Sequence, residues 1–322
     1  MRILGGLLAA LFGMVASAAA AGTVGFQAVS VPVAGDRPLQ VGVWYPSDAA
    51  EAPLRLGLDM QTVAAKGAIV GRGHPLIVMS HGTGGWYGSN DDTARALARA
   101  GFVVAAVSHT GDTFDDRSRA TRMADRPAQL VRLIDYMTGA WPDRTAVDAR
   151  KVGVFGFSSG GFTALAAIGG EPDLSLIGPH CQAHPAYFDC NLMRQSGGAA
   201  LADGPWVHDP RIRAAVIAAP ALGFTFAPNG LSKVKVPVQL WRAQNDSVLP
   251  HPLYAEAVRG LLPRSPDYRV VAGADHYDFL APCGPGMAKA APAVCGGKGF
   301  DRTAFHASFN ADVVAFFQRT LR

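Results

Sequence analysis

Along the chain, continuous apolar runs are followed by segments with apolar residues at helical spacing, a pattern that predicts strands followed by helices. Continuous apolar runs, as in residues 74–82 and 102–109, are typical of strands buried on both faces of a sheet. Segments with apolar residues at helical spacing follow each of these two runs. The pattern continues to the C-terminus and predicts strands at 23–33, 39–46, 74–82, 102–109, 151–157, 211–220, 235–243 and 267–273, and helices at 91–101, 125–139, 159–170, 252–262 and 303–321.

This alternation predicts an α/β fold with a mostly parallel central sheet and helices on both faces. In such sheets the functional side chains follow the carboxyl ends of the strands. The polar residues directly after each apolar run are therefore the candidates for a site. Residues 171–210 have little periodicity, and an insertion of this length is typical of a lid or binding loop.

The composition narrows the class of protein. Hydrophobic residues make up 49% of the 322 residues and charged residues 17%, which excludes global disorder. The net charge is only +4 and no long basic run occurs, so nothing indicates a nucleic-acid partner.

Residues 1–21 are typical of a secretory signal peptide. Arg2 is followed by an apolar stretch from Leu4 to Val15 and then by small residues up to Ala21. We therefore expect one domain, residues 22–322, that is secreted or periplasmic and has no stable membrane span once the signal is cleaved. A retained N-terminal anchor is the alternative.

The four cysteines form two close pairs in the sequence. Export would place them in an oxidising compartment, so we expect the disulfides Cys181–Cys190 and Cys283–Cys295, one of three possible pairings. A zinc site built from the first pair with His180 and His184 is the alternative, although its spacing matches no common zinc pattern.

Residues 156–160 read GFSSG and fit the G-x-S-x-G motif, with Ser158 at its centre. An apolar strand precedes the motif and an alanine-rich helix follows it, which is the context of a nucleophile elbow. The flanking glycines avoid clashes in this sharp turn, and the turn sets the next N–H at a helix N-terminus. We expect Ser158 to be the nucleophile and Ser159 to contribute only its backbone N–H.

A serine nucleophile needs a general base and an orienting acid, which in this motif follow the serine in the order acid, then histidine. Asp246 follows the strand at 235–243, and His276 follows the strand at 267–273. These two residues are therefore the predicted acid and base. Asp275 and Asp278 flank the histidine too closely in sequence to be the usual acid.

The loop after the strand at 74–82 is the expected source of a second oxyanion donor. Its glycines allow close approach of backbone, and the N–H of Thr83 is our candidate. Trp86 and Tyr87 in the same loop are candidates for the wall of the substrate pocket. We expect His81 to brace this loop and not to be the base, because it precedes the serine in the chain. We also expect His109 to brace a loop, with contact to the substrate as the alternative.

Four segments, PLIVMSHGTGG, GFSSGG, NDSVLP and ADHYDFLAPC, resemble the α/β-hydrolase superfamily. More narrowly they resemble the secreted, predicted dienelactone hydrolases, which are related to plasma-type platelet-activating-factor acetylhydrolases and to cutinase-like polyester hydrolases. The resemblance covers residues 25–322 and implies the same roles for Ser158, Asp246 and His276. True dienelactone hydrolases use a cysteine where Ser158 stands, so the resemblance does not imply activity on dienelactone.

Together these residues predict a serine carboxylic-ester hydrolase that works through an acyl-enzyme and needs no metal or organic cofactor. Its expected partner is a small-molecule or lipid ester. An acyltransferase with the same triad and a catalytically silent binding protein on the same fold are the alternatives.

Overall fold

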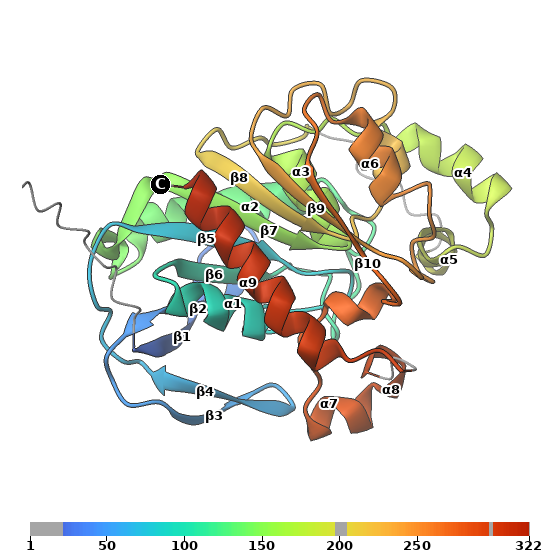
Figure 1. The fold of residues 1–322 in the computed structure, drawn as a ribbon. Coiled ribbons are helices and arrows are strands. Elements are labelled where there is room, and N and C mark those ends of the chain that lie inside the picture. The colour runs from blue at the N-terminus through green and yellow to red at the C-terminus, as the bar shows by residue number, and fades with distance from the viewer. Residues whose placement is uncertain (1–21, 197–204, 296–298, 322) are drawn as a thin grey trace, which may run out of the picture.

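The structure is a computed structural model that describes residues 22–196, 205–295 and 299–321. The predicted signal peptide lies outside these residues. Ten strands form one sheet in the order β10-β9-β8-β7-β5-β6-β2-β1-β4-β3 (Figure 1). The strands are β1 (Thr23–Val31), β2 (Leu39–Ser47), β3 (Ala52–Leu56), β4 (Asp59–Ala65), β5 (His74–Ser80), β6 (Val103–Ser108), β7 (Val147–Phe157), β8 (Ile212–Ala218), β9 (Val238–Ala243) and β10 (Asp267–Val271).

The half of the sheet from β6 to β10 is parallel throughout. Antiparallel pairs join β6 to β2, β2 to β1, and β4 to β3, whereas β1 and β4 are parallel. The carboxyl ends of β5, β7, β8, β9 and β10 therefore meet at one edge, where the chemistry of such sheets lies.

Helices cover both faces of the sheet, as the alternating sequence pattern predicts. Helices α1 and α9 pack together on one face, and α2 and α3 pack together on the other (Figure 1). The helices are α1 (Asp91–Arg99), α2 (Asp125–Asp135), α3 (Ser159–Ala167), α4 (Ile177–Ala183), α5 (Phe188–Gln195), α6 (Ala255–Leu261), α7 (Pro285–Ala290), α8 (Pro292–Cys295) and α9 (Arg302–Thr320), with short turns η1 (Tyr136–Ala140), η2 (Arg144–Ala146), η3 (Leu174–Leu176), η4 (Gly223–Phe226) and η5 (His276–Phe279).

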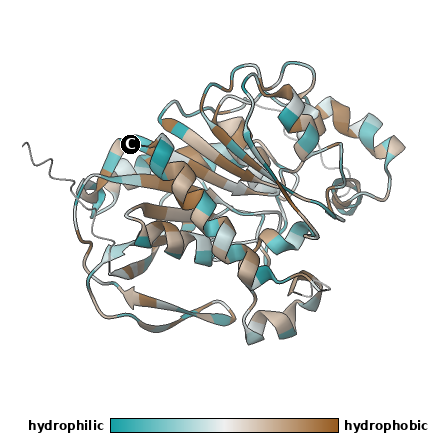
Figure 2. Ribbon diagram, in the orientation of Figure 1, coloured by the Kyte–Doolittle hydropathy of each residue, from teal (hydrophilic) through white to brown (hydrophobic). Residues whose placement is uncertain are grey.

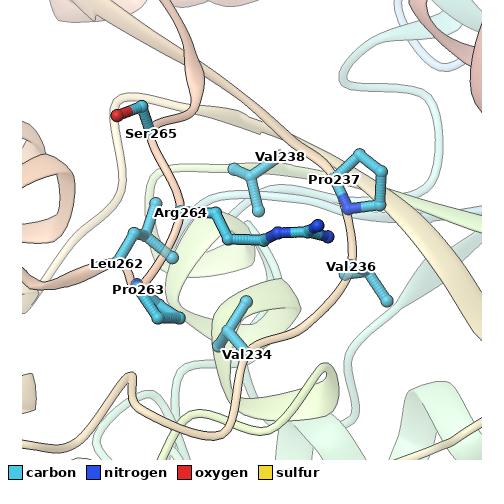
Figure 3. A pocket seen from close by; sticks show the side chains of 8 residues that line it. All are labelled: Val234, Val236, Pro237, Val238, Leu262, Pro263, Arg264 and Ser265. Carbon is cyan, nitrogen blue, oxygen red and sulfur yellow. The ribbon is translucent and has the colours of Figure 1, made fainter.

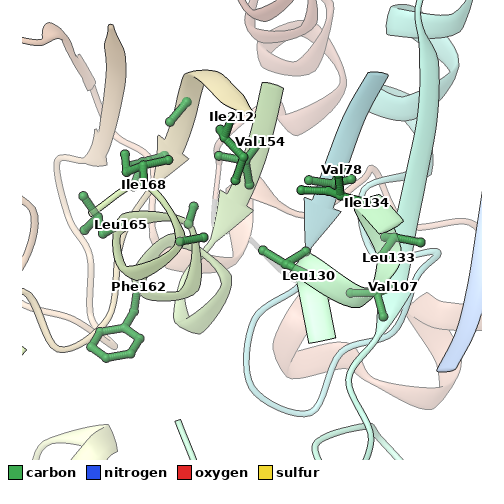
Figure 4. Packing of buried hydrophobic residues seen from close by; sticks show 14 of the residues in the cluster. Val78, Val107, Leu130, Leu133, Ile134, Val154, Phe162, Leu165, Ile168 and Ile212 are labelled. Carbon is green, nitrogen blue, oxygen red and sulfur yellow. The ribbon is translucent and has the colours of Figure 1, made fainter. Parts of the chain in front are cut away.

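The side chains of the central strands pack into two hydrophobic cores, one on each face of the sheet. In β5, Val78 packs in the core under α2 and α3, and its neighbour Ile77 packs in the core under α1 and α9. Figure 4 shows part of the first core, which includes Leu130 and Ile134 of α2 and Leu165 of α3 together with Val78 and Val154 of the strands. The hydrophobic colour in Figure 2 is correspondingly concentrated in the central strands. This two-sided burial explains why these strands show no alternation of polar and apolar residues.

Besides the short helices α7 and α8 and the short turns, two parts of the chain are not among the elements that the sequence pattern predicts. The first is the hairpin of β3 and β4, whose tip residue Asp59 accepts hydrogen bonds from the N–H groups of Gly284, Gly286 and Met287. The second is the insertion, in which η3, α4 and α5 occur within the described part of residues 171–210. Within the described residues, no helix is both long and apolar enough to cross a bilayer.

Candidate active site

Ser158 occupies a strained turn between β7 and α3. Its backbone has φ 56° and ψ −119°, a region that residues with a side chain rarely adopt. The flanking glycines are required by close packing, because a Cβ on Gly156 would lie 2.1 Å from the carbonyl oxygen of Gly160. A Cβ on Gly160 would lie 1.9 Å from the carbonyl oxygen of Ser80. The turn therefore has the geometry of the predicted nucleophile elbow.

The structure brings Ser158, His276 and Asp246 together in one hydrogen-bonded row. The hydroxyl oxygen of Ser158 lies 3.0 Å from Nε2 of His276, and Nδ1 of the same ring lies 2.9 Å from Oδ2 of Asp246. All three residues are buried, with 6%, 2% and 8% of their surface exposed. The ionised carboxylate can only accept, so Nδ1 carries the hydrogen and Nε2 is free to accept from the serine hydroxyl.

Each member of this row is positioned by the end of a strand. Asp246 follows β9, and its second oxygen accepts from the N–H groups of Val248 and Leu249 at 3.1 and 2.7 Å. His276 follows β10 and begins the short turn η5. The polar loops after two neighbouring parallel strands thus meet above the elbow.

Asp275 joins these two loops, a role that its position in the sequence does not reveal. Its carboxylate accepts from the N–H of Ser247 at 2.7 Å, from the hydroxyl of Ser247, and from the N–H of His276 at 2.7 Å. Its own N–H donates to Asp278 at 2.8 Å, which completes a capping box on η5. The carboxylate that contacts the His276 ring is that of Asp246, as the sequence order predicts.

The loop after β5 lies against the elbow. A Cβ on Gly82 would lie 3.1 Å from the Cβ of Ser158. The N–H groups of Gly84 and Gly85 donate to Asp112 and to the carbonyl of Gly82, respectively, and that of Trp86 donates to Ser89. Among residues 83–86, all within the described chain, only the N–H of Thr83 has no hydrogen-bond acceptor.

The hydroxyl groups of Thr83 and Ser159 form a hydrogen bond of 2.6 Å. Our expectation that only the N–H of Ser159 is used therefore needs correction, because its side chain joins the elbow to the loop after β5. The G-x-S-x-G pattern carries no signal for this contact, since the position after the central serine is free to vary in the motif.

His81 and His109 brace loops, as expected. Nδ1 of His81 donates to the carbonyl of Gly82, and its Nε2 accepts from the N–H of His109. The His109 ring bonds to Ser80 and Gln129. Burial, aided by the nearby charge of Arg126, lowers the pKa of His81 to about 3 and holds that of His109 well below its ordinary value. Both rings are therefore neutral and already fully used as hydrogen-bond partners.

Trp86 and Tyr87 lie half-buried beside this loop, and they face different neighbours. The Trp86 ring rests on Gly57 at the tip of the β3–β4 hairpin and meets the exposed Phe114 edge-on, with centroids 6.3 Å apart. The Tyr87 ring packs against Gly42 and Trp44 of β2. Tyr87 thus contacts the sheet, whereas Trp86 borders an exposed aromatic surface.

The cysteines form the two predicted disulfides, Cys181–Cys190 and Cys283–Cys295. His180, Asp189 and Cys190 lie close enough together to hold an ion, but the Cys190 sulfur is consumed in its disulfide. His184 stacks on Tyr187, with ring centroids 4.6 Å apart. The zinc alternative built on both cysteines is therefore wrong.

A surface hollow of about 210 Å³ lies at the opposite edge of the sheet from Ser158. Figure 3 shows its lining, which comes from the segments just before β9 and β10 and includes Val236, Leu262 and Arg264. Because these segments precede parallel strands, the hollow faces away from the carboxyl ends that carry Ser158, Asp246 and His276. It is no part of the candidate site.

Comparison with known proteins gives a match in structure but not in sequence. No protein-family model matches the chain, and no curated protein matches it. A solved structure of a ferulic acid esterase from Streptomyces cinnamoneus is similar, with a TM-score of 0.64 and 22% sequence identity over 93% of this chain and 90% of that chain. At this identity the likeness concerns the fold alone. The chain has the α/β-hydrolase fold, which it shares with that esterase.

Proposed function

We propose that this protein is a serine esterase that hydrolyses carboxylic esters through an acyl-enzyme. One observation carries the proposal: the hydroxyl of Ser158, held on a strained elbow, lies 3.0 Å from a His276 ring whose far nitrogen is held by Asp246 at 2.9 Å. Nucleophile, base and orienting acid in this geometry are the parts that acyl transfer requires.

In the proposed mechanism, Ser158 attacks the ester carbonyl while Nε2 of His276 takes the hydroxyl proton. Asp246 holds the imidazole in the required tautomer and stabilises its charged form. The N–H groups of Thr83 and Ser159 bind the oxyanion, and each such donor contributes about 3 kcal/mol to the transition state. The alcohol leaves with the proton from His276. His276 then takes a proton from water, which attacks the acyl-enzyme and releases the acid and the free Ser158 hydroxyl.

Two further observations support the wider proposal. Two disulfides fit a protein of an oxidising compartment, which agrees with the signal peptide that we expect at residues 1–21. The similar solved structure is named as a ferulic acid esterase, so we would test feruloyl esters as well as simple acyl esters.

The test is hydrolysis of a p-nitrophenyl ester series from acetate to palmitate, and of methyl ferulate, by the wild type and by Ser158→Ala. We expect turnover of at least one ester by the wild type and its loss in Ser158→Ala, with unchanged circular dichroism. Adding glycerol and measuring free acid against glyceryl ester separates a hydrolase from an acyltransferase. Full activity in Ser158→Ala, or no turnover of any ester by the wild type, would contradict the proposal.

A further inference from the structure

A buried arginine lies beneath the loops that surround Ser158. Arg126 is the second residue of α2, and only 3% of its side chain is exposed. It forms an ion pair with Asp112, whose side chain is 2% exposed and which lies in the segment that follows β6. A buried ion pair is costly to form, and its net value for stability is small, so a specific positional role is a reasonable explanation for one.

The guanidinium group of Arg126 reaches three separate parts of the fold. It donates to Asp112 after β6, to the carbonyl of His81 after β5, and to the hydroxyl of Thr163 in α3, the last at 3.0 Å. Its Nη2 also lies 3.5 Å from the hydroxyl of Ser80. Arginine suits this arrangement because its planar fork offers five donors in fixed directions.

The partners of Arg126 lead in turn to the two proposed oxyanion donors. The carboxylate oxygen of Asp112 that does not contact Arg126 accepts a hydrogen bond of 2.8 Å from the N–H of Gly84, which holds the peptide that follows Thr83. The hydroxyl of Thr163 donates to the carbonyl of Ser159 at 2.7 Å, which holds the first turn of α3. Arg126 therefore reaches both sides of the Thr83–Ser159 hydrogen bond, each through one intermediate residue.

The charge of Arg126 also fits the hydrogen-bond pattern around it. Nδ1 of His81 donates to a carbonyl and its Nε2 accepts from the N–H of His109, which requires a neutral ring, and a neutral His109 ring can accept from the hydroxyl of Ser80. A nearby buried cation disfavours their protonation. Arg126 thus adds to the effect of burial in keeping the acceptor atom of His81 on which the loop after β5 depends.

We propose that Arg126, with Asp112, is a positioning residue that sets the geometry of the oxyanion site formed by the N–H groups of Thr83 and Ser159. This inference rests on the proposed esterase function. It predicts that disturbing the pair weakens stabilisation of the transition state and leaves substrate binding in the ground state almost unchanged.

The experiment compares Arg126→Met, Arg126→Lys and Asp112→Asn with the wild type on the best p-nitrophenyl ester. We expect kcat to fall about 10- to 100-fold in Arg126→Met, the scale of effect of a small misplacement of catalytic groups, with KM changed less than about threefold. Arg126→Lys should be intermediate, because it keeps the charge and loses the fork. The Ki of a trifluoromethyl ketone, which forms a tetrahedral oxyanion on the serine, should rise in parallel with the loss of kcat/KM.

The matched control is Arg211→Met, which breaks the ion pair of Arg211 with the buried Asp209. Both residues lie just before β8 and therefore at the opposite edge of the sheet from Ser158. This variant should lower the melting temperature and leave kcat and the inhibitor Ki at wild-type values. If Arg126→Met does not fold, Asp112→Asn and Thr163→Val, which remove one partner each, decide the question by the same readouts.

Wild-type kcat in folded Arg126 and Asp112 variants would overturn the inference. So would a loss of kcat with an unchanged inhibitor Ki, or an equal loss in Arg211→Met. Ser158→Ala in the same series keeps the two proposals apart. Full activity there contradicts the esterase mechanism, whereas loss there with wild-type activity in the Arg126 variants contradicts only the positioning role.

Discussion

The hydroxyl oxygens of Thr83 and Ser159 lie 2.6 Å apart and join the loop after β5 to the first turn of α3. These are the two residues whose N–H groups we propose as the oxyanion site. The hydroxyl of Ser159, the second serine in GFSSGG, therefore has a structural role besides that of its N–H. The contact also links the two proposed donors directly, in addition to the contacts that Arg126 makes through Asp112 and Thr163.

The first prediction concerns this hydrogen bond. Ser159→Ala and Thr83→Val each remove one hydroxyl, and a hydrogen bond of this kind contributes about 1 kcal/mol, so kcat/KM should fall about fivefold in each. The double variant should lose no more than either single one, because both remove the same contact. Thr83→Ser keeps the hydroxyl and is the control, with wild-type kcat/KM. Fully additive losses would show that the contact does not couple the two residues.

A second prediction separates the two aspartates beside His276. Asp246→Asn should lower kcat by about 10⁴-fold, because an amide favours the wrong tautomer of the imidazole. Asp275→Asn should cost far less, since Asp275 contacts Ser247 and the backbone of His276 and not the ring. Steady-state kinetics of the two variants at one pH measures the difference. Equal losses would contradict the assignment of Asp246 as the orienting acid.

The two disulfides should differ in their effect on activity. Arg302 contacts Cys283 at 3.6 Å and the carbonyl of Val294 at 2.7 Å, and it also holds Asp278 in the turn that begins with His276. Replacing Cys283 and Cys295 with serine should therefore lower kcat as well as stability. Closing a loop of this length stabilises a protein by about 3 kcal/mol.

The double replacement of Cys181 and Cys190 is the matched comparison, because that disulfide closes a loop of similar size within the insertion. It should lower the free energy of unfolding by a similar amount. At a temperature where both variants are folded, kcat should be lower in the Cys283/Cys295 variant than in the Cys181/Cys190 variant. The reverse order would contradict the link from the second disulfide to His276.

Stability should also depend on pH through His81. Its pKa is lowered by burial from an ordinary 6.5 to about 3 in the folded protein. Between these values the unfolded chain binds a proton that the folded chain does not, so the free energy of unfolding rises with pH across this window. The stability is fully present above pH 6.5 and is lost progressively as the pH falls towards 3.

Urea unfolding of the wild type and of His81→Gln from pH 4 to pH 8 tests this prediction. Glutamine can keep an acceptor near the N–H of His109 but does not titrate. The free energy of unfolding of His81→Gln should therefore fall less steeply than that of the wild type as the pH is lowered. Parallel curves for the two proteins would show that His81 contributes nothing to the acid sensitivity.

The sequence predicts those parts of the structure that depend on local patterns. Apolar runs marked the central parallel strands β5 to β8, because strands buried on both faces need apolar side chains. Ser158, Asp246 and His276 each follow a predicted strand in the expected order, and the structure brings them together. Both disulfides followed from short sequence separations.

The parts that the sequence did not reveal depend on contacts between distant segments. The β3–β4 hairpin lies at the edge of the sheet, and it is anchored by Asp59 to the N–H groups of residues 284–287. Arg126 looks like an ordinary charge in the first turn of an amphipathic helix. Only the fold brings Asp112, His81 and Thr163 around it.

Covalent labelling with a fluorophosphonate tests whether the hydroxyl of Ser158 is the nucleophile. Tandem mass spectrometry of the peptide that contains both serines locates the adduct. We expect one equivalent of label on Ser158 in the wild type, none in Ser158→Ala, and slower labelling in Asp246→Asn. A label on Ser159 or elsewhere, or an unlabelled wild type that still hydrolyses esters, would contradict this assignment.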